Sequence, residues 1–160
     1  MIFKLFSIES KDITIAGHSF GGKVATLLSP KNLVLLSTAG ILEEKPLKVR
    51  LKIKLAKILG ILGLSNITKA FRSSDVNKMS QNMYETFKNV VDEDFTNQFK
   101  SFKNNCLIFW GKADSATLLE SGKKIHELIG QSEFYDYDGD HYFFLKHYKE
   151  IGEICGNRFI

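Results

Sequence analysis

A serine set among glycines is the first group in this 160-residue chain that could do covalent chemistry. Residues 17–22 read Gly-His-Ser-Phe-Gly-Gly, which fits G-x-S-x-G with a further glycine. A serine raised on a sharp strand-to-helix turn is strained and needs small neighbours. The helix after it directs free N–H groups towards a developing oxyanion. The pattern predicts Ser19 as nucleophile and the Phe20 N–H as oxyanion donor. The alternative is a glycine-rich turn that only packs tightly or cradles a phosphate.

A serine hydroxyl also needs a base, and the base needs a third group that fixes its tautomer. Two loops that follow predicted strands supply both residue types. Asp114 follows the apolar run that ends at Trp110, and His141 comes shortly after the next predicted strand. We predict His141 as the base and Asp114 as the acid, although an aspartate at such a position is more commonly an N-cap-like or turn residue. Asp138 and Asp140 compete for the acid role, but they are too close to His141 in sequence to reach the far side of its ring easily.

The remaining histidines have less favourable positions. His18 lies inside the glycine motif and is expected to shape the site, whereas His126 and His147 lie in predicted helices and are expected at the surface or in packing. A metal cluster is the other interpretation of the acidic loop around His141. Its spacing matches no metal-binding loop, so solvation of a turn explains it better. We expect no metal and no cofactor. The cluster would consist of Asp136, Asp138, Asp140 and His141.

Short apolar runs that alternate with helical segments must position these groups. Strands are predicted at residues 13–16, 33–36, 106–110 and 133–137, and helices at 2–8, 23–28, 118–129 and 142–154. Strand, helix and strand within 30 residues form a βαβ unit, which implies parallel strands and a right-handed crossover. Residues 41–102 differ: they are predicted to form further helices, although residues 47–55 could instead form a strand. The sequence therefore predicts an α/β fold with four parallel strands in chain order and a helical insertion after the second strand.

Taken together, the motifs resemble the α/β-hydrolase superfamily in its lid-bearing serine subgroup. The resemblance covers nearly the whole chain and keeps the family's order of Ser, Asp and His. It rests on residues 17–22, 33–40, 108–114 and 139–145. It implies a partial α/β-hydrolase core at 1–40 and 103–160, with a lid at 41–102. It also implies hydrolysis of an ester or related carbonyl, or carbon–carbon bond hydrolysis by the same residues.

The resemblance further implies a lid that roofs the site and excludes water. Five apolar side chains are candidate walls of a substrate pocket, although ordinary core packing explains any one of them as well. The candidates are Met79, Met83, Phe87, Leu118 and Phe143.

In the resembling family several strands precede the nucleophile, and one of their loops supplies a second oxyanion donor. This chain begins about a dozen residues before its first predicted strand, so we expect an N-terminally truncated hydrolase with impaired activity. We also expect an open apolar edge at Ile13 to Ala16 that pairs with another chain or with a missing segment. The alternative is a non-catalytic remnant that acts, if at all, as a binding module.

Composition and charge bear on the protein's location and on the molecules it could bind. The formal net charge is +4, and much of it comes from a basic run between Lys45 and Lys57. A solvent-exposed face of the lid explains this run best. The alternative is a surface that attracts anionic lipid or acidic substrates. No nucleic-acid motif is present. Cys106 and Cys155 form no disulfide framework, and no apolar run reaches the length of a membrane span. We expect a cytoplasmic protein that acts on a small ester-like molecule.

Overall fold

The computed structural model describes residues 9–42, 90 and 93–159. The chain divides into two compact units. One comprises Met1–Ile41 with Asp94–Ile160, and the other comprises Leu42–Glu93. The helix predicted at residues 2–8, the helices predicted between 45 and 91 and the basic run all lie outside the described residues. The fold and site described below belong to the first unit.

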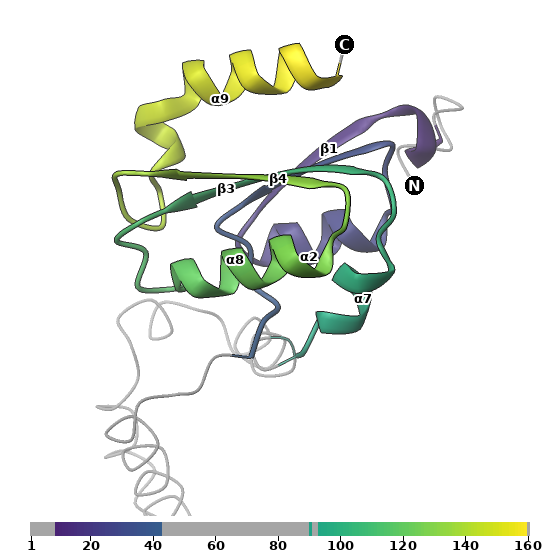
Figure 1. The fold of residues 1–160 in the computed structure, drawn as a ribbon, viewed down its shortest axis with the longest axis horizontal. Coiled ribbons are helices and arrows are strands. Elements are labelled where there is room, and N and C mark those ends of the chain that lie inside the picture. Colours follow the sequence, from purple (N-terminus) through teal and green to yellow (C-terminus); the bar gives the residue numbers. More distant parts are fainter. Residues whose placement is uncertain (1–8, 43–89, 91–92, 160) are drawn as a thin grey trace, which may run out of the picture. The chain divides into compact units, whose positions relative to one another are not determined.

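Four parallel strands form the sheet at the centre of this unit (Figure 1). They are β1 (Thr14–His18), β2 (Asn32–Leu36), β3 (Asn105–Gly111) and β4 (Ser132–Tyr137). Their order is β1-β2-β3-β4, with Ala16 opposite Val34 and Leu35 opposite Ile108. The predicted sheet and its order are therefore confirmed. Because all four strands are parallel, their carboxyl ends and the loops that follow share one edge.

Helices cover both faces of the sheet. Figure 1 shows helices below the sheet and a further helix above it. The lower ones are α2 (Phe20–Leu27), α7 (Thr96–Ser101) and α8 (Leu119–Leu128), and the upper one is α9 (Phe144–Phe159). A short 3₁₀ turn, η1 (Ser10–Asp12), precedes β1. Side chains alternate between the two faces of a strand, so a strand covered on both faces reads as one continuous apolar run.

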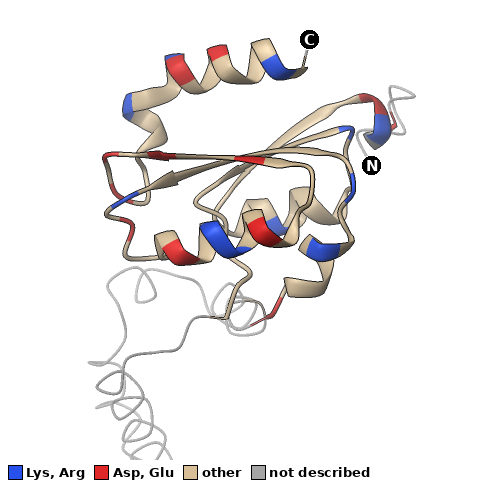
Figure 2. Ribbon diagram, in the orientation of Figure 1, with Lys and Arg blue, Asp and Glu red and all other residues tan. Residues whose placement is uncertain are grey.

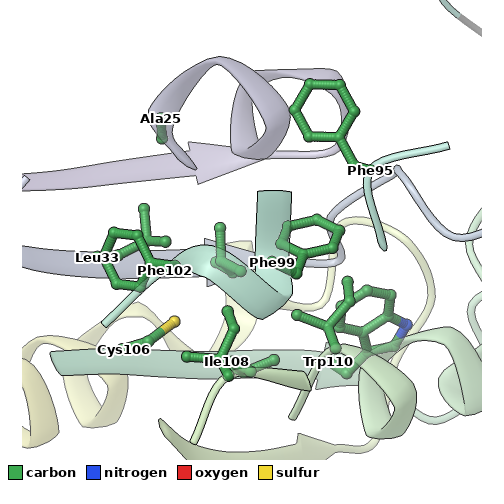
Figure 3. Packing of buried hydrophobic residues seen from close by; sticks show 11 residues of the cluster. Ala25, Leu33, Phe95, Phe99, Phe102, Cys106, Ile108 and Trp110 are labelled. Atoms are coloured by element: carbon green, nitrogen blue, oxygen red, sulfur yellow. The ribbon is translucent and has the colours of Figure 1, made fainter. Parts of the chain in front are cut away.

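Two hydrophobic clusters result from this alternation. On β3, Ile108 and Trp110 belong to the cluster beneath the sheet, while Leu107 and Phe109 belong to the cluster under α9. All four are at most 2% exposed. Figure 3 shows the lower cluster, in which Ala25 of α2 and the phenylalanines around α7 gather over these β3 side chains. The two cores hold the loops at the carboxyl edge on a rigid base.

The helix α7 belongs to the first unit, although the sequence places residues up to 102 in the insertion. Phe95, Phe99 and Phe102 recur at helical spacing and are 2%, 0% and 4% exposed in the lower cluster. The N–H of Phe95 donates to the carbonyl of Gly40 over 2.8 Å. The chain therefore leaves this unit and returns to it at adjacent points. An amphipathic helix does not reveal from its own sequence which unit its apolar face will cover.

The β1 side of the sheet is more open than the β4 side. Among the described strands β1 pairs only with β2, and Thr14 and Ala16 are exposed, so the segment predicted as a buried strand is only partly buried. The neighbouring helix α2 also exposes apolar side chains: Phe20 46%, Val24 44%, Leu27 63% and Leu28 38%. Pairing of this edge with a further segment stays a prediction.

Charged residues lie mainly along α8 and α9 and in the loops at the carboxyl ends of β3 and β4, as Figure 2 shows. Those on α8 form exposed ion pairs one turn apart, Glu120 with Lys123 and Lys124 with Glu127. Such exposed pairs contribute little to stability. Within the described ranges, no helix has the length and apolar character needed to cross a membrane.

Candidate active site

The turn between β1 and α2 holds Ser19 in a strained conformation. Its φ of 53° and ψ of −121° lie where non-glycine residues are rare, at a cost of about 1–3 kcal/mol. Three backbone hydrogen bonds hold this turn. The N–H of Ser19 donates to the carbonyl of Leu36, and the Ser19 carbonyl accepts from Gly22 and Ala39, all over 3.0–3.1 Å. The strand end, the helix start and the loop after β2 thus fix Ser19 together.

Close packing explains two of the glycines around Ser19. A Cβ at Gly17 would lie 2.4 Å from the carbonyl oxygen of Gly21, and one at Gly22 would lie 2.2 Å from the Thr38 hydroxyl. At Gly21 an added Cβ meets no described atom within 4 Å. Among the described residues, close packing therefore accounts for Gly17 and Gly22 but not for Gly21. The steric need falls instead on Gly22, which packs against the loop after β2.

The backbone N–H of Phe20 opens α2. No backbone acceptor for it exists among the described residues, as expected for the first turn of a helix. Such an N–H is free to donate a hydrogen bond to a ligand, and the helix dipole favours a negatively charged ligand atom there.

Asp114 occupies the turn after β3, and its side chain is 0% exposed. Its Oδ1 accepts the N–H groups of Ala116 (2.8 Å) and Thr117 (3.0 Å). Its Oδ2 accepts the hydroxyl of Thr117 (2.9 Å) and Nδ1–H of His141 (2.8 Å). One oxygen therefore stabilises the turn while the other holds the imidazole. Asp114 is therefore both a turn residue and the hydrogen-bond partner of the His141 ring.

The charge state of Asp114 follows from these contacts. Burial alone would raise the pKa of this carboxyl, but hydrogen bonds from Thr117, His141, Ser37 and Ala116 outweigh it and lower the pKa. Ser37 has φ of 43°, and its buried hydroxyl makes no hydrogen bond of ordinary geometry. It nevertheless lies close enough to the carboxylate to contribute. Asp114 is thus a carboxylate at neutral pH, ready to stabilise a positive charge on its partner ring.

His141 lies in the loop between β4 and α9, and its side chain is 15% exposed. Because Nδ1 donates to Asp114, the neutral ring keeps a lone pair on Nε2, where a base must accept a proton. The backbone of the same residue is fixed from β1, because Nε2–H of His18 donates to the His141 carbonyl over 3.0 Å. The two imidazole centroids are 4.5 Å apart. The structure thereby brings His141 beside the residue that precedes Ser19.

The contact between the nucleophile and the base is not closed in this structure. Among the described residues, no hydrogen bond joins the Ser19 hydroxyl to the His141 ring. Catalytic hydrogen bonds are often long before substrate binds and shorten in the complex, so a missing hydrogen bond here is compatible with a role for both side chains. The structure joins Asp114 with His141 directly, and joins His141 with the Ser19 turn through His18.

The rival acids and the other histidines have separate roles. Asp138 is 91% exposed and pairs with Lys112, and Asp140 accepts the N–H of Tyr142. His126 contacts the Ser132 hydroxyl, and His147 contacts the carbonyl of Asp138, both at exposed positions. The described residues contain no group of three or more His, Cys, Asp or Glu arranged to hold a metal.

Two of the five candidate pocket residues lie in the described part of the chain, and their exposure differs. Phe143 is 1% exposed and stacks on Tyr137 in the cluster under α9, as the core-packing alternative implies. Leu118, at the start of α8, is 46% exposed. Three further candidates lie outside the described residues: Met79, Met83 and Phe87.

Sequence reasoning missed two residues that shape this site. Thr117 contacts both Asp114 and, over 3.4 Å, Nδ1 of His141, and its carbonyl accepts Nε1–H of the buried Trp110. Asp-x-x-Thr after a strand is a turn pattern that could have pointed to it. Ser37 has no such signal, because its approach to Asp114 depends on the pairing of β2 with β3.

Comparison with known proteins identifies the fold. No family model matches the sequence, and no curated protein matches it. Solved structures match well. An esterase from Exiguobacterium antarcticum is 19% identical with a TM-score of 0.69, and the match covers 98% of this chain and 69% of that one. An α/β fold family hydrolase from Bacillus anthracis is 17% identical with a TM-score of 0.67, covering 98% and 69%.

A meta-cleavage product hydrolase from Pseudomonas fluorescens is 15% identical with a TM-score of 0.61, covering 96% of this chain and 66% of that one. The chain spans 62–69% of the length of the solved structures compared. At these identities the likeness concerns the fold. This chain has part of the α/β-hydrolase fold: four parallel strands of its sheet, flanked by helices.

Proposed function

We propose that this chain is a serine hydrolase in which Ser19, His141 and Asp114 form the catalytic triad. The observation that carries the proposal is the part-buried hydrogen bond from His141 to Asp114, together with a strained serine on a strand-to-helix turn. This combination supplies a nucleophile, a base with a free Nε2 and an acid with a lowered pKa. The fold adds weight, because the structural neighbours include an esterase and a meta-cleavage product hydrolase.

In the proposed reaction, the Ser19 hydroxyl attacks the carbonyl carbon of an ester while its proton passes to Nε2 of His141. The carbonyl oxygen becomes an oxyanion that accepts a hydrogen bond from the Phe20 N–H. The resulting imidazolium is stabilised by the Asp114 carboxylate. Collapse of the intermediate breaks the bond to the alcohol, which takes the proton from Nε2 and leaves an acyl-serine. Water, deprotonated by His141, then releases the acid and restores Ser19.

The rate depends on how many donors face the oxyanion. The described residues offer one candidate, the Phe20 N–H. Loss of one donor of such a pair costs about 10²- to 10³-fold in turnover. We therefore propose that both acylation and deacylation are slow unless another segment adds a second N–H. Acylation by a reactive probe is a better first test than turnover of an ester.

The test is labelling by a fluorophosphonate, which reacts only with an activated serine. We expect the native chain to be labelled and Ser19→Ala to be unlabelled. Ser101→Ala is the matched control, because its exposed hydroxyl donates only to the carbonyl of Gln98 at the end of α7. This variant should label at the native rate. Absence of labelling in the native chain under conditions where it is folded would favour the non-catalytic remnant.

The type of scissile bond is a separate question. We propose an ester or related carbonyl as the first choice, with a carbon–carbon bond next to a carbonyl as the variant. A chromogenic p-nitrophenyl ester and a vinylogous diketone acid of the meta-cleavage type, assayed side by side, distinguish the two. Both activities should disappear in Ser19→Ala.

A further inference from the structure

His18 joins two parts of the site that are 123 residues apart in sequence. It is the last residue of β1 and directly precedes Ser19. Its Nε2 lies 3.0 Å from the carbonyl oxygen of His141. A carbonyl can only accept, so Nε2 of His18 carries the proton and its Nδ1 is free of one when the ring is neutral. The ring that fastens the loop therefore cannot take the Ser19 proton at the same nitrogen.

The rest of the His18 ring packs against aromatic side chains of this loop and of the start of α9. Its centroid is 4.5 Å from that of His141, 5.4 Å from that of Tyr142 and 4.8 Å from that of Phe144, the first residue of α9. These contacts restrict how the loop can move relative to the end of β1. Each aromatic contact of this kind contributes beyond the area it buries.

We propose that His18 is a positioning residue: its neutral ring holds the His141 loop against the nucleophile turn, so that Nε2 of His141 faces Ser19. The proposal rests on the proposed function, and it adds a role that neither the serine motif nor the acid–base pair requires. Small displacements of a base from its nucleophile are costly, since about 1 Å can lower the rate roughly 10²-fold.

The charges around His18 favour the neutral form. The titratable groups that act on it are His141 and Asp114, and Tyr142 packs against its ring. Burial lowers the pKa of His18 most, and a positive His141 lowers it further, while the hydrogen bond to the carbonyl and the Asp114 charge act in the opposite direction. A neutral His18 avoids a second cation beside the imidazolium that forms during the reaction. Its role as a donor is thus compatible with proton transfer to His141.

Two variants separate the hydrogen bond from the aromatic packing. His18→Gln keeps an N–H donor at about the reach of Nε2, and His18→Phe keeps a ring but loses the donor. We expect His18→Phe to label with fluorophosphonate about 10- to 100-fold more slowly than the native chain, and His18→Gln to recover most of that loss. His126→Phe, at an exposed position on α8, is the matched control and should label at the native rate.

A second readout distinguishes positioning from general stability. The ring ¹H–¹⁵N NMR signals of His141 are recorded at one fixed pH in each variant, alongside the unfolding temperature, because they report whether Nδ1 still donates to Asp114. We expect these signals to shift in His18→Phe and to return towards their native positions in His18→Gln. Native labelling and unchanged His141 signals in His18→Phe would overturn the proposal.

The two proposals fail in different ways. If the native chain is not labelled but the His141 ring NMR signals still respond to His18→Phe, the proposed function fails and the contact between the two histidines stands. If labelling depends on Ser19 but not on His18, the function stands and the positioning role fails. A loss of labelling that matches a loss of folded protein in both His18 variants also counts against a positioning role.

Discussion

The two halves of the candidate site differ in how completely they are held. On the acid–base side, both oxygens of Asp114 accept two hydrogen bonds each, and the side chain is fully buried. On the nucleophile side, Ser19 sits in a strained turn, its hydroxyl makes no hydrogen bond to another described residue, and the adjoining α2 exposes an apolar face. The first half is complete within the described fold. The second depends more on what approaches β1 and α2.

This difference shows where function and stability are coupled. Contacts around Asp114 serve the fold and the proposed chemistry at once, so changes there should affect both. At Ser19 the strain is maintained by backbone hydrogen bonds and close glycine contacts, so the side chain itself can change without loss of the fold. Substitutions that change stability and labelling by different amounts therefore test whether the two halves of the site differ in this way.

The largest effect is expected for Asp114→Asn. The amide can still accept N–H groups in the turn through its oxygen, but it disfavours the tautomer of His141 that leaves Nε2 free. Labelling by fluorophosphonate should fall about 10³- to 10⁴-fold, on the precedent of the same change in a serine protease triad. Asp138→Asn is the control, because that exposed carboxylate pairs only with Lys112. Comparable losses in both variants would mean that the acid has been assigned to the wrong residue.

Substitution of the elbow glycines should separate close packing from sequence pattern. Gly22→Ala places a Cβ against the Thr38 side chain and should destabilise the fold by about 1–3 kcal/mol, since overpacking forces shifts in the backbone. Gly21→Ala meets no described atom and removes a glycine from a helix, so it should be neutral or stabilise by up to about 1 kcal/mol. Urea denaturation followed by circular dichroism measures both. Equal destabilisation would show that Gly21 is also tightly packed.

A smaller loss of stability is expected for Thr117→Val. The substitution keeps the shape but removes the hydroxyl that donates to Asp114, at a cost of about 1 kcal/mol. Labelling should also slow, because the carboxylate loses one of the side chains that hold it. Thr96→Val is matched to it, since Thr96 makes the same kind of hydrogen bond to Asp94 at an exposed site far from His141. Only Thr117→Val should change both quantities.

The comparison also explains how far the sequence leads. The sheet was predictable because strands covered on both faces, such as residues 106–110, form continuous apolar runs, and short crossovers leave few topologies. The helix α2 begins at Phe20 instead of residue 23, because glycines in its first turn are tolerated when the strand end and a loop pack against them. Local sequence weighs against such glycines, while tertiary packing requires at least Gly22.

Within the site, the residue types and their order were predictable, and their contacts were not. Asp114 and His141 follow strand ends, where parallel topology gathers loops. The approach of Thr117 to the Ser37 carbonyl joins residues 80 apart, and that of His18 to His141 joins residues 123 apart. Such contacts depend on strand register and on side-chain rotamers across β1, β2 and β3. No spacing along the chain records them.

The smallest effect is expected on the exposed face of α2, and it tests how open the nucleophile half is. Leu27 is 63% exposed, so Leu27→Lys should change the free energy of unfolding by no more than about 0.5 kcal/mol. Leu35→Ala, a buried aliphatic on β2 at 0% exposure, is the contrasting variant and should cost about 2–5 kcal/mol. A loss of more than about 2 kcal/mol in Leu27→Lys would show that this face is covered in solution, because only a buried leucine loses that much free energy when a charge replaces it. The contrast between the two halves of the site would then reflect an interface and not an open surface.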